Sequence, residues 1–232
     1  MPESDLTALL TGMRRAARTG QDLTAFDART LARHAGVDSL SLTLISAQGA
    51  LELVWGDPGD PVGRPLEDLQ YTLGEGPTLD AVTTRRLITV PDLHTALQWP
   101  ALAEAAPAVS TARAVAALPV RLGIIVPAVL TAYRTTPIPF TPRRLDTLTT
   151  LAHALVHPLL QTSTTDLVHT SIGAPDLLRA EVHQAAGMTS VHLGIPIDQA
   201  LVRLRSHAWA HDQALRTIAH DVVTGRLRLE RA

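Results

Sequence analysis

The spacing of apolar residues changes along the chain and predicts where helices give way to strands. Apolar residues recur at helical spacing over residues 6–17 and again up to Gly36, which predicts two helices. Apolar and polar residues then alternate over residues 40–44, which predicts a strand with one buried and one solvated face. A short turn over residues 47–50 leads to a second strand over residues 51–55, so we expect a β-hairpin.

The middle of the chain continues with short strands between short helices. Three further strands are expected, over residues 87–90, 113–121 and 126–134. A short helix is expected over residues 77–81, and Trp99-Pro100 predicts the start of another, because proline is tolerated in a first helical turn. This order of elements predicts an α+β fold, in which helices cover an antiparallel sheet.

Helical spacing returns in three pieces over residues 178–223. Their apolar faces are made by Leu178, Val182, Ala185 and Thr189; by Ile197, Ala200, Leu201, Leu204 and Ala208; and by Leu215, Ile218, Ala219, Val222 and Val223. Pro196 suits the first turn of the second helix, and Gly225 follows the third. A three-helix bundle of this size buries little core, so we expect it to lean on a neighbour or a dimer partner.

A connector separates the two parts. Thr141-Pro142 predicts a helix start, after which apolar residues form a stripe at the spacing of a coiled coil, at Leu145, Leu148, Ala152, Leu155 and Leu159. We expect Pro158 to interrupt this helix and a polar link to follow. Because the connector helix and the first helix each present an apolar stripe, we predict a homodimer. The chain thus divides into an N-terminal helix (1–21), a sheet domain (22–140), the connector (141–175) and the bundle (176–232).

Composition narrows the classes of function. With 46% hydrophobic and 18% charged residues, the chain has the balance of a folded protein. It has no cysteine, which excludes disulfides, thiolate zinc sites and cysteine nucleophiles. Its first residues lack the order of a signal peptide, and no apolar run approaches the ~20 residues of a membrane span, so we expect a cytoplasmic protein.

Few residues are arranged for catalysis or metal binding. The Gly74-Glu-Gly76 turn lacks the Lys-Ser/Thr of a P-loop and the spacing of a dinucleotide-binding turn, which favours a structural role. His207 and His211 have the spacing of a helix-borne metal pair with Asp212 nearby, but solvated surface histidines are the more common case. No serine lies in a Gly-x-Ser-x-Gly elbow. We therefore expect no enzymatic activity, no cofactor and no metal.

Four short motifs mark the C-terminal segment: Gln184-Ala185-x-Gly187-Met188, Leu193-Gly194-Ile195, Ala200-x-x-x-Leu204-Arg205 and Leu215-Arg216-x-Ile218-Ala219-x-x-Val222-Val223. Together they resemble the ANTAR domain, a bacterial three-helix module that binds paired RNA stem-loops and prevents transcription termination. The resemblance implies RNA contacts by Arg205, His207, Trp209, Arg216 and His220, since RNA loops are bound by aromatic stacking and by arginine. Arg205 and Arg216 lie outside the apolar faces, so we expect both to face solvent.

A second set of motifs lies upstream: Leu73-Gly-Glu-Gly-Pro77, Val90-Pro-Asp-Leu93, Trp99-Pro100, Arg113-Ala-Val with Leu118-Pro-Val120, and Val129-Leu-Thr-Ala-Tyr133. Over residues 22–160 the chain resembles the GAF domain, a ligand-sensing module. This implies an apolar pocket with Trp55, Tyr71, Trp99 and Val115 as lining candidates, and core packing is the alternative for each. The chain has no Asn, Lys or Cys, which argues against cyclic-nucleotide binding and excludes bilin attachment.

The two resemblances together predict a regulator whose GAF-like domain senses a small molecule and whose bundle binds paired RNA stem-loops. Ala186, His207 and His220 stand where ANTAR domains often have lysine, tyrosine and arginine, and the net charge is −2. A dimeric interaction protein whose bundle does not bind RNA is therefore the alternative. DNA binding through a helix-turn-helix over residues 197–223 is a third hypothesis, which would need base-contacting polar residues along one helix.

Overall fold

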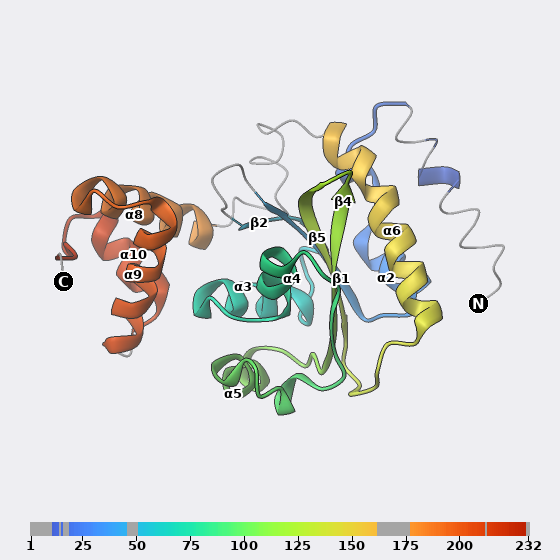
Figure 1. Cartoon of the computed structure of the whole chain (residues 1–232), viewed down its shortest axis with the longest axis horizontal. Helices are drawn as coiled ribbons and strands as arrows, with labels where there is room; N and C mark the ends of the chain where they lie inside the picture. The colour runs from blue at the N-terminus through green and yellow to red at the C-terminus, as the bar shows by residue number, and fades with distance from the viewer. Residues whose placement is uncertain are drawn as a thin grey trace.

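A five-stranded antiparallel sheet organises the first part of the chain (Figure 1). The computed structural model describes residues 11–13, 15, 19–45, 51–161, 177–211 and 213–230. The strand order is β2-β1-β5-β4-β3, with β1 (Ser39–Ile45), β2 (Leu51–Gly56), β3 (Ile88–Val90), β4 (Ala114–Leu122) and β5 (Ile125–Arg134). The predicted strands and the α+β class are confirmed. The predicted turn between β1 and β2 lies outside the described residues.

Helices cover both faces of the sheet (Figure 1). One face carries η1 (Leu23–Ala25), α2 (Ala28–Ala35) and α6 (Pro142–Gln161). The other carries α3 (Gly63–Leu73), α4 (Pro77–Thr84), η2 (Leu93–Thr95) and α5 (Pro100–Val109). Because α6 packs on the sheet, we extend the name sheet domain from the predicted residues 22–140 to residues 19–161. The helix predicted before Gly36 is split in two, because Asp22 caps η1 and Asp27 separately caps α2.

Strand β1 shows that the two faces of the sheet differ chemically. Successive side chains of a strand point to opposite faces. Leu40 and Leu42 join the apolar cluster with α2 and α6. Ser39, Ser41 and Thr43 lie on the other face and are all buried. The predicted solvated face of this strand is therefore wrong, because α3 and α4 cover its hydroxyl groups.

Helix α3 is an element that the sequence pattern did not predict. Its start is fixed by the Asp60 carboxylate, which accepts the N–H groups of residues 62–64 at 2.8, 2.9 and 3.2 Å. Gly63 lies so close to β1 that an added Cβ would fall 2.4 Å from Ser39 Oγ. The preceding sequence is rich in Asp, Pro and Gly and predicts only a loop. The buried face of α3 also mixes polar with apolar residues, which blurs its periodicity.

Helix α6 packs its apolar stripe on the sheet, so this stripe is not available to a dimer partner. Leu148 and Leu155 are 0% and 1% exposed and belong to the same buried cluster as strands β1, β4 and β5. The helix also runs through Pro158, so the predicted interruption is wrong. The homodimer prediction thus loses one of its two stripes. The other stripe, over residues 6–17, lies mostly outside the described residues, as does the predicted link after α6, although Met13 is buried against the sheet domain.

The last three helices pack on one another as a bundle (Figure 1). They are α8 (Leu177–Leu193), α9 (Ile197–Ala210) and α10 (Leu215–Val223). Pro196 directly precedes α9, and Gly225 follows α10 with a φ of 74°. Their buried cluster also contains Tyr71 of α3, so the bundle leans on the sheet domain as its size predicts. None of the described helices combines the length and apolar character needed to cross a membrane.

Candidate functional site

A carboxylate is buried on the hydroxyl-bearing face of the sheet. Glu67 of α3 is 3% exposed, and its Oε1 atom accepts three hydrogen bonds. The donors are Ser41 Oγ at 2.8 Å, Thr78 Oγ1 at 3.1 Å and Tyr133 OH at 2.5 Å. The Thr43 hydroxyl lies 3.4 Å from Oε2. We call these five residues the Glu67 cluster, in which hydroxyl groups take the place of the water that a carboxylate otherwise binds.

Neighbouring groups extend this cluster. The Thr131 hydroxyl lies 3.0 Å from that of Thr78 and donates to it, because Thr78 gives its one proton to Glu67. Gln70 Oε1 accepts the N–H of Thr78 at 2.8 Å, whereas Gln70 Nε2 is buried with no acceptor among the described residues. Burial and then the Glu67 carboxylate raise the pKa of Tyr133 well above its usual value, so the phenol keeps its proton and donates it.

The turn from Gly74 to Gly76 sets α4 against α3. Gly76 has a φ of 139°, and an added Cβ there would lie 2.4 Å from Gln70 Oε1. The Glu75 carboxylate between the two glycines accepts the N–H of Leu102, in the first turn of α5, at 2.8 Å. These contacts give the turn the structural role that its sequence indicates.

The four residues predicted to line a ligand pocket are buried but do not meet in one cavity. Trp55 lies on the α2 and α6 face of the sheet, where its indole N–H donates to a backbone carbonyl at 2.8 Å. Trp99 and Val115 belong to one buried cluster on the opposite face, and the Trp99 indole donates to Asp80 at 3.1 Å. Tyr71 belongs to the buried cluster of the bundle. The structure thus distributes the four over three clusters.

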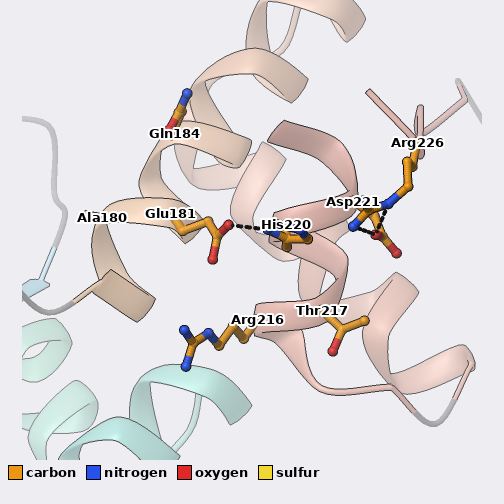
Figure 2. Close-up of a pocket in the computed structure, with 8 residues that line it drawn as sticks. All are labelled: Ala180, Glu181, Gln184, Arg216, Thr217, His220, Asp221 and Arg226. Carbon is orange, nitrogen blue, oxygen red and sulfur yellow. Dashed lines mark hydrogen bonds and ion pairs between the residues drawn. The ribbon is translucent and has the colours of Figure 1, made fainter. Parts of the chain in front are cut away.

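A polar groove of about 550 Å³ lies between α8 and α10 (Figure 2). It is lined by Ala180, Glu181, Gln184, Arg216, Thr217, His220, Asp221 and Arg226. His220 Nδ1 lies 2.7 Å from a Glu181 oxygen, and Arg226 pairs with Asp221 at 2.8 Å. Arg216 is exposed, and among the residues drawn it joins neither pair (Figure 2). The α8–α10 groove therefore unites two of the residues predicted to contact RNA, Arg216 and His220.

The other three residues predicted to contact RNA lie on α9. Trp209 is 74% exposed. His207 is half-buried and stacks on His211 with 4.0 Å between ring centroids, and burial followed by His211 lowers the pKa of His207. Arg205 does not face solvent as predicted. Its guanidinium lies 5.4 Å from the centroid of the Tyr71 ring and donates to the Tyr71 carbonyl, because α3 covers that side of α9.

The surface where the bundle meets the sheet domain, which we call the seam, is incompletely filled. Arg205 borders two cavities there. The smaller, of about 260 Å³, is lined mainly by apolar side chains of α4, α8 and α9, with Tyr71 and His183. The larger, of about 890 Å³, opens between the end of α3 and the exposed Trp209. Burial lowers the pKa of Arg205 from its usual value.

The metal ligands considered in the sequence, His207 and His211 with Asp212 nearby, lie on α9 or directly after it. Among the residues that the structure describes, no three His, Asp or Glu side chains are grouped so that they could hold a metal ion. His207 and His211 stack face to face, and His211 Nδ1 lies 2.9 Å from the carbonyl oxygen of His207. Asp212, the third residue considered, lies outside the described residues.

Comparison with known families assigns the sheet domain. A model of the GAF domain matches residues 13–156, which is more than half of the chain. The chain belongs to the GAF domain family. The match takes in the whole sheet and the Glu67 cluster, so we call the sheet domain the GAF domain from this point. A GAF domain is a module of signal sensing or interaction that can bind small molecules. No curated protein sequence matches the chain.

Solved structures are similar to this chain at low sequence identity. The GAF domain of the phosphoenolpyruvate-protein phosphotransferase from Acinetobacter is 17% identical, with a TM-score of 0.52 over 70% of this chain and 96% of that one. The GAF domain of such a phosphotransferase from Coxiella burnetii is 13% identical, with a TM-score of 0.49 over 67% and 91%. The type II free methionine-R-sulfoxide reductase from Thermoplasma acidophilum is 15% identical, with a TM-score of 0.46 over 63% and 94%. The first of these likenesses supports the fold and carries no information on ligand.

Sequence reasoning missed the acidic residues of both polar regions. Glu67 and Gln70 follow Gly63 and Leu66 at helical spacing, so the buried face of α3 was available as a signal once a helix had been assumed. Glu181 lies one helical turn before a residue of the first C-terminal motif, and only the packing of α8 on α10 brings it to His220. Neither carboxylate belongs to a sequence pattern that indicates chemistry by itself.

Proposed function

We propose that this chain is a signal-responsive regulator that binds RNA stem-loops and controls transcription termination. In this proposal the GAF domain senses a small molecule, and the bundle is the part that binds RNA. The observation that carries the proposal is the α8–α10 groove, in which the exposed Arg216 shares a polar surface with Gln184 and His220.

The groove offers the donors and acceptors that RNA recognition needs. The Arg216 guanidinium can give two parallel hydrogen bonds to a phosphate or to a base edge. The Gln184 amide both donates and accepts, which suits the edges of unpaired bases. Trp209 exposes 74% of its surface on α9 and would provide a stacking surface for a base.

The resemblance of the bundle to the ANTAR domain supports RNA as the ligand. Arg216 stands at a basic position of that pattern. The apolar residues that surround it in the motif, Leu215, Ile218 and Val222, are buried in the bundle core, so the helix turns Arg216 outward. The motif thus combines an apolar anchor with an exposed cation, which is the arrangement that a phosphate contact requires.

A second candidate is an interaction protein whose bundle binds another protein. The groove contains two carboxylates, Glu181 and Asp221, and each engages a cationic or ionisable partner within the groove. Such carboxylates oppose phosphate and suit a partner with its own basic groups. Neither candidate includes catalysis.

RNA titration of the full chain tests the proposed function. Arg216→Ala should weaken binding to a two-hairpin RNA and lower the slope of log affinity against log salt by about 0.7–0.9, because one phosphate contact is lost. Folding stability should change by less than about 0.5 kcal/mol, since the side chain is exposed. Arg86→Ala is the matched control, because Arg86 is an exposed arginine of the GAF domain far from the groove in sequence.

The same titration separates the two candidates. Weaker binding by the Arg216 variant with unchanged binding by the Arg86 variant would support the groove as the RNA site. Equal losses in both variants would indicate only nonspecific charge attraction and contradict the assignment of the groove. If the unaltered chain binds no RNA at any salt concentration, the interaction protein becomes the better reading.

A further inference from the structure

Tyr71 holds the bundle to the GAF domain. It is 3% exposed and lies in the buried cluster of the bundle, where it is the one residue from the GAF domain among the described members. Its ring is tilted against His183 of α8 at 5.9 Å between centroids, with the hydroxyl 3.5 Å from His183 Nε2. A buried aromatic residue that fills the partner's core is the usual anchor of an interface.

Arg205 makes the complementary contact from the bundle. Its guanidinium lies over the Tyr71 ring and donates to the Tyr71 backbone carbonyl, while its Nε is buried with no acceptor among the described residues. An arginine at this position loses its hydration and regains only part of it in hydrogen bonds. The contact with Tyr71 therefore holds the Arg205 side chain in place but leaves its Nε–H group without a hydrogen-bond acceptor among the described residues.

The seam around this pair is divided by two clefts that open to solvent. Cavities of about 260 Å³ and 890 Å³ border Arg205 on the GAF-domain side of α9. Both cavities open to solvent, so the seam is a partly solvated interface and not one continuous packed core. Interfaces between domains of one chain commonly separate unless they are large and apolar. The seam thus has one strong anchor and little continuous packing to support it.

We infer that the seam is a regulatory latch, in which Tyr71 keeps Arg205 away from RNA until the bundle separates from the GAF domain. This inference rests on the proposed function, because it concerns one of the residues that would contact RNA. In the latched state the α8–α10 groove, with Arg216, stays open to solvent, whereas Arg205 is half-buried and its guanidinium is held against Tyr71. Opening adds a second cation to the RNA-binding surface and so couples the GAF domain to binding.

Thiol labelling tests the latch without RNA. The chain has no cysteine, so Leu201→Cys introduces a single thiol at a half-buried position that lines the smaller cavity of the seam. Adding Tyr71→Ala should speed its labelling roughly tenfold, as expected if fewer than one molecule in ten is open beforehand. Val223→Cys is the control, because Val223 is half-buried on α10 within the bundle and does not line the seam cavities. Its labelling should not change with Tyr71→Ala.

RNA titration of the full chain then connects opening to binding. Tyr71→Ala should raise affinity for the two-hairpin RNA up to about tenfold. Arg205→Ala should speed labelling at Leu201→Cys in the same way but lack this gain in affinity, because the uncovered cation is missing.

A second opening variant is needed if Tyr71→Ala fails to fold. Leu79→Glu places a charge in the smaller cavity from α4, and Leu87→Glu, at an exposed position outside the cavity, is its control.

Each outcome decides between the latch and the proposed function. Faster labelling with tighter RNA binding supports both. Unchanged labelling in Tyr71→Ala and Leu79→Glu, while the unaltered chain binds RNA, overturns the latch and leaves the proposed function standing. Faster labelling with no RNA binding by any variant overturns the proposed function and the latch with it. Faster labelling at Val223→Cys as well would mean that the bundle unfolds, and this also overturns the latch.

Discussion

Two carboxylates, Glu67 in the GAF domain and Glu181 in the bundle, occupy opposite kinds of polar site. Glu67 of α3 is buried between α3, α4 and the sheet, and the donors of the three hydrogen bonds to its Oε1 atom are all hydroxyl groups. Glu181 lies at the edge of an open groove, and its partner, His220, is half exposed to solvent. The same functional group is thus part of the core in one region and part of a binding surface in the other.

The difference shows how burial changes the consequence of a hydrogen bond. In the Glu67 cluster, loss of one partner leaves the others without an acceptor or donor in a site that water does not reach easily. In the groove, solvent can replace any lost partner, so a change alters recognition more than stability. Stability and binding measurements on matched variants can therefore separate the two regions.

Replacing the two glutamates by alanine should have the largest and most unequal effects. Glu67→Ala removes the acceptor of three hydroxyl groups and leaves a cavity, so we expect about 2–4 kcal/mol of destabilisation. Glu181→Ala should cost less than about 0.5 kcal/mol, because its contact with His220 is half exposed to solvent on the His220 side. Denaturant unfolding measures this when tryptophan fluorescence, which reports on the buried Trp55 and Trp99 of the GAF domain, is recorded together with circular dichroism, which reports on the helices of the bundle as well.

Equal losses of stability in Glu67→Ala and Glu181→Ala would contradict the difference between the buried and the exposed carboxylate. Glu67→Gln serves as the control for shape, because it keeps the volume of the side chain while changing its charge and one oxygen. It should recover part of the stability lost in Glu67→Ala, since Gln still accepts hydrogen bonds at its remaining oxygen.

Removing the phenol oxygen of Tyr133 should have an intermediate effect. Tyr133→Phe deletes the 2.5 Å hydrogen bond to Glu67, so we expect a cost of about 1.5–3 kcal/mol. In the Glu67→Ala background the same substitution should cost much less, because the acceptor is already gone. A double-mutant cycle measures the difference. Additive costs would mean that the Tyr133 hydroxyl stabilises the fold independently of Glu67, and would contradict the coupling.

The smallest effect should come from acidification of the bundle. The pKa of His207 is lowered by burial and by His211, so the folded state favours the neutral ring. Stability present above the unfolded-state value of about 6.5 is therefore lost as the pH falls through the lower folded-state value. His207→Gln should reduce the loss measured between about pH 7.5 and about pH 5.5, by at most about 2 °C in thermal midpoint. An unchanged pH dependence would exclude His207 as its source.

The sequence by itself determined the elements whose side chains repeat with one clear period. The strands of the sheet and helices α8 to α10 were predicted because their apolar residues lie at spacings of two or of three and four. Capping residues and prolines placed several boundaries as well, such as Trp99-Pro100 before α5. Such information is local, and so it is present in any stretch of the chain long enough to form one element.

Tertiary structure decided which polar groups are covered. The alternation of Ser41 and Thr43 with leucines predicts a solvated face, and only the packing of α3 and α4 turned that face into the site of a buried carboxylate. The same holds for Arg205, which lies outside the apolar face of its own helix but is covered by Tyr71, 134 positions away in sequence. Periodicity reports which side of an element is apolar. It cannot report what packs against the other side, because that depends on contacts between residues far apart in the chain.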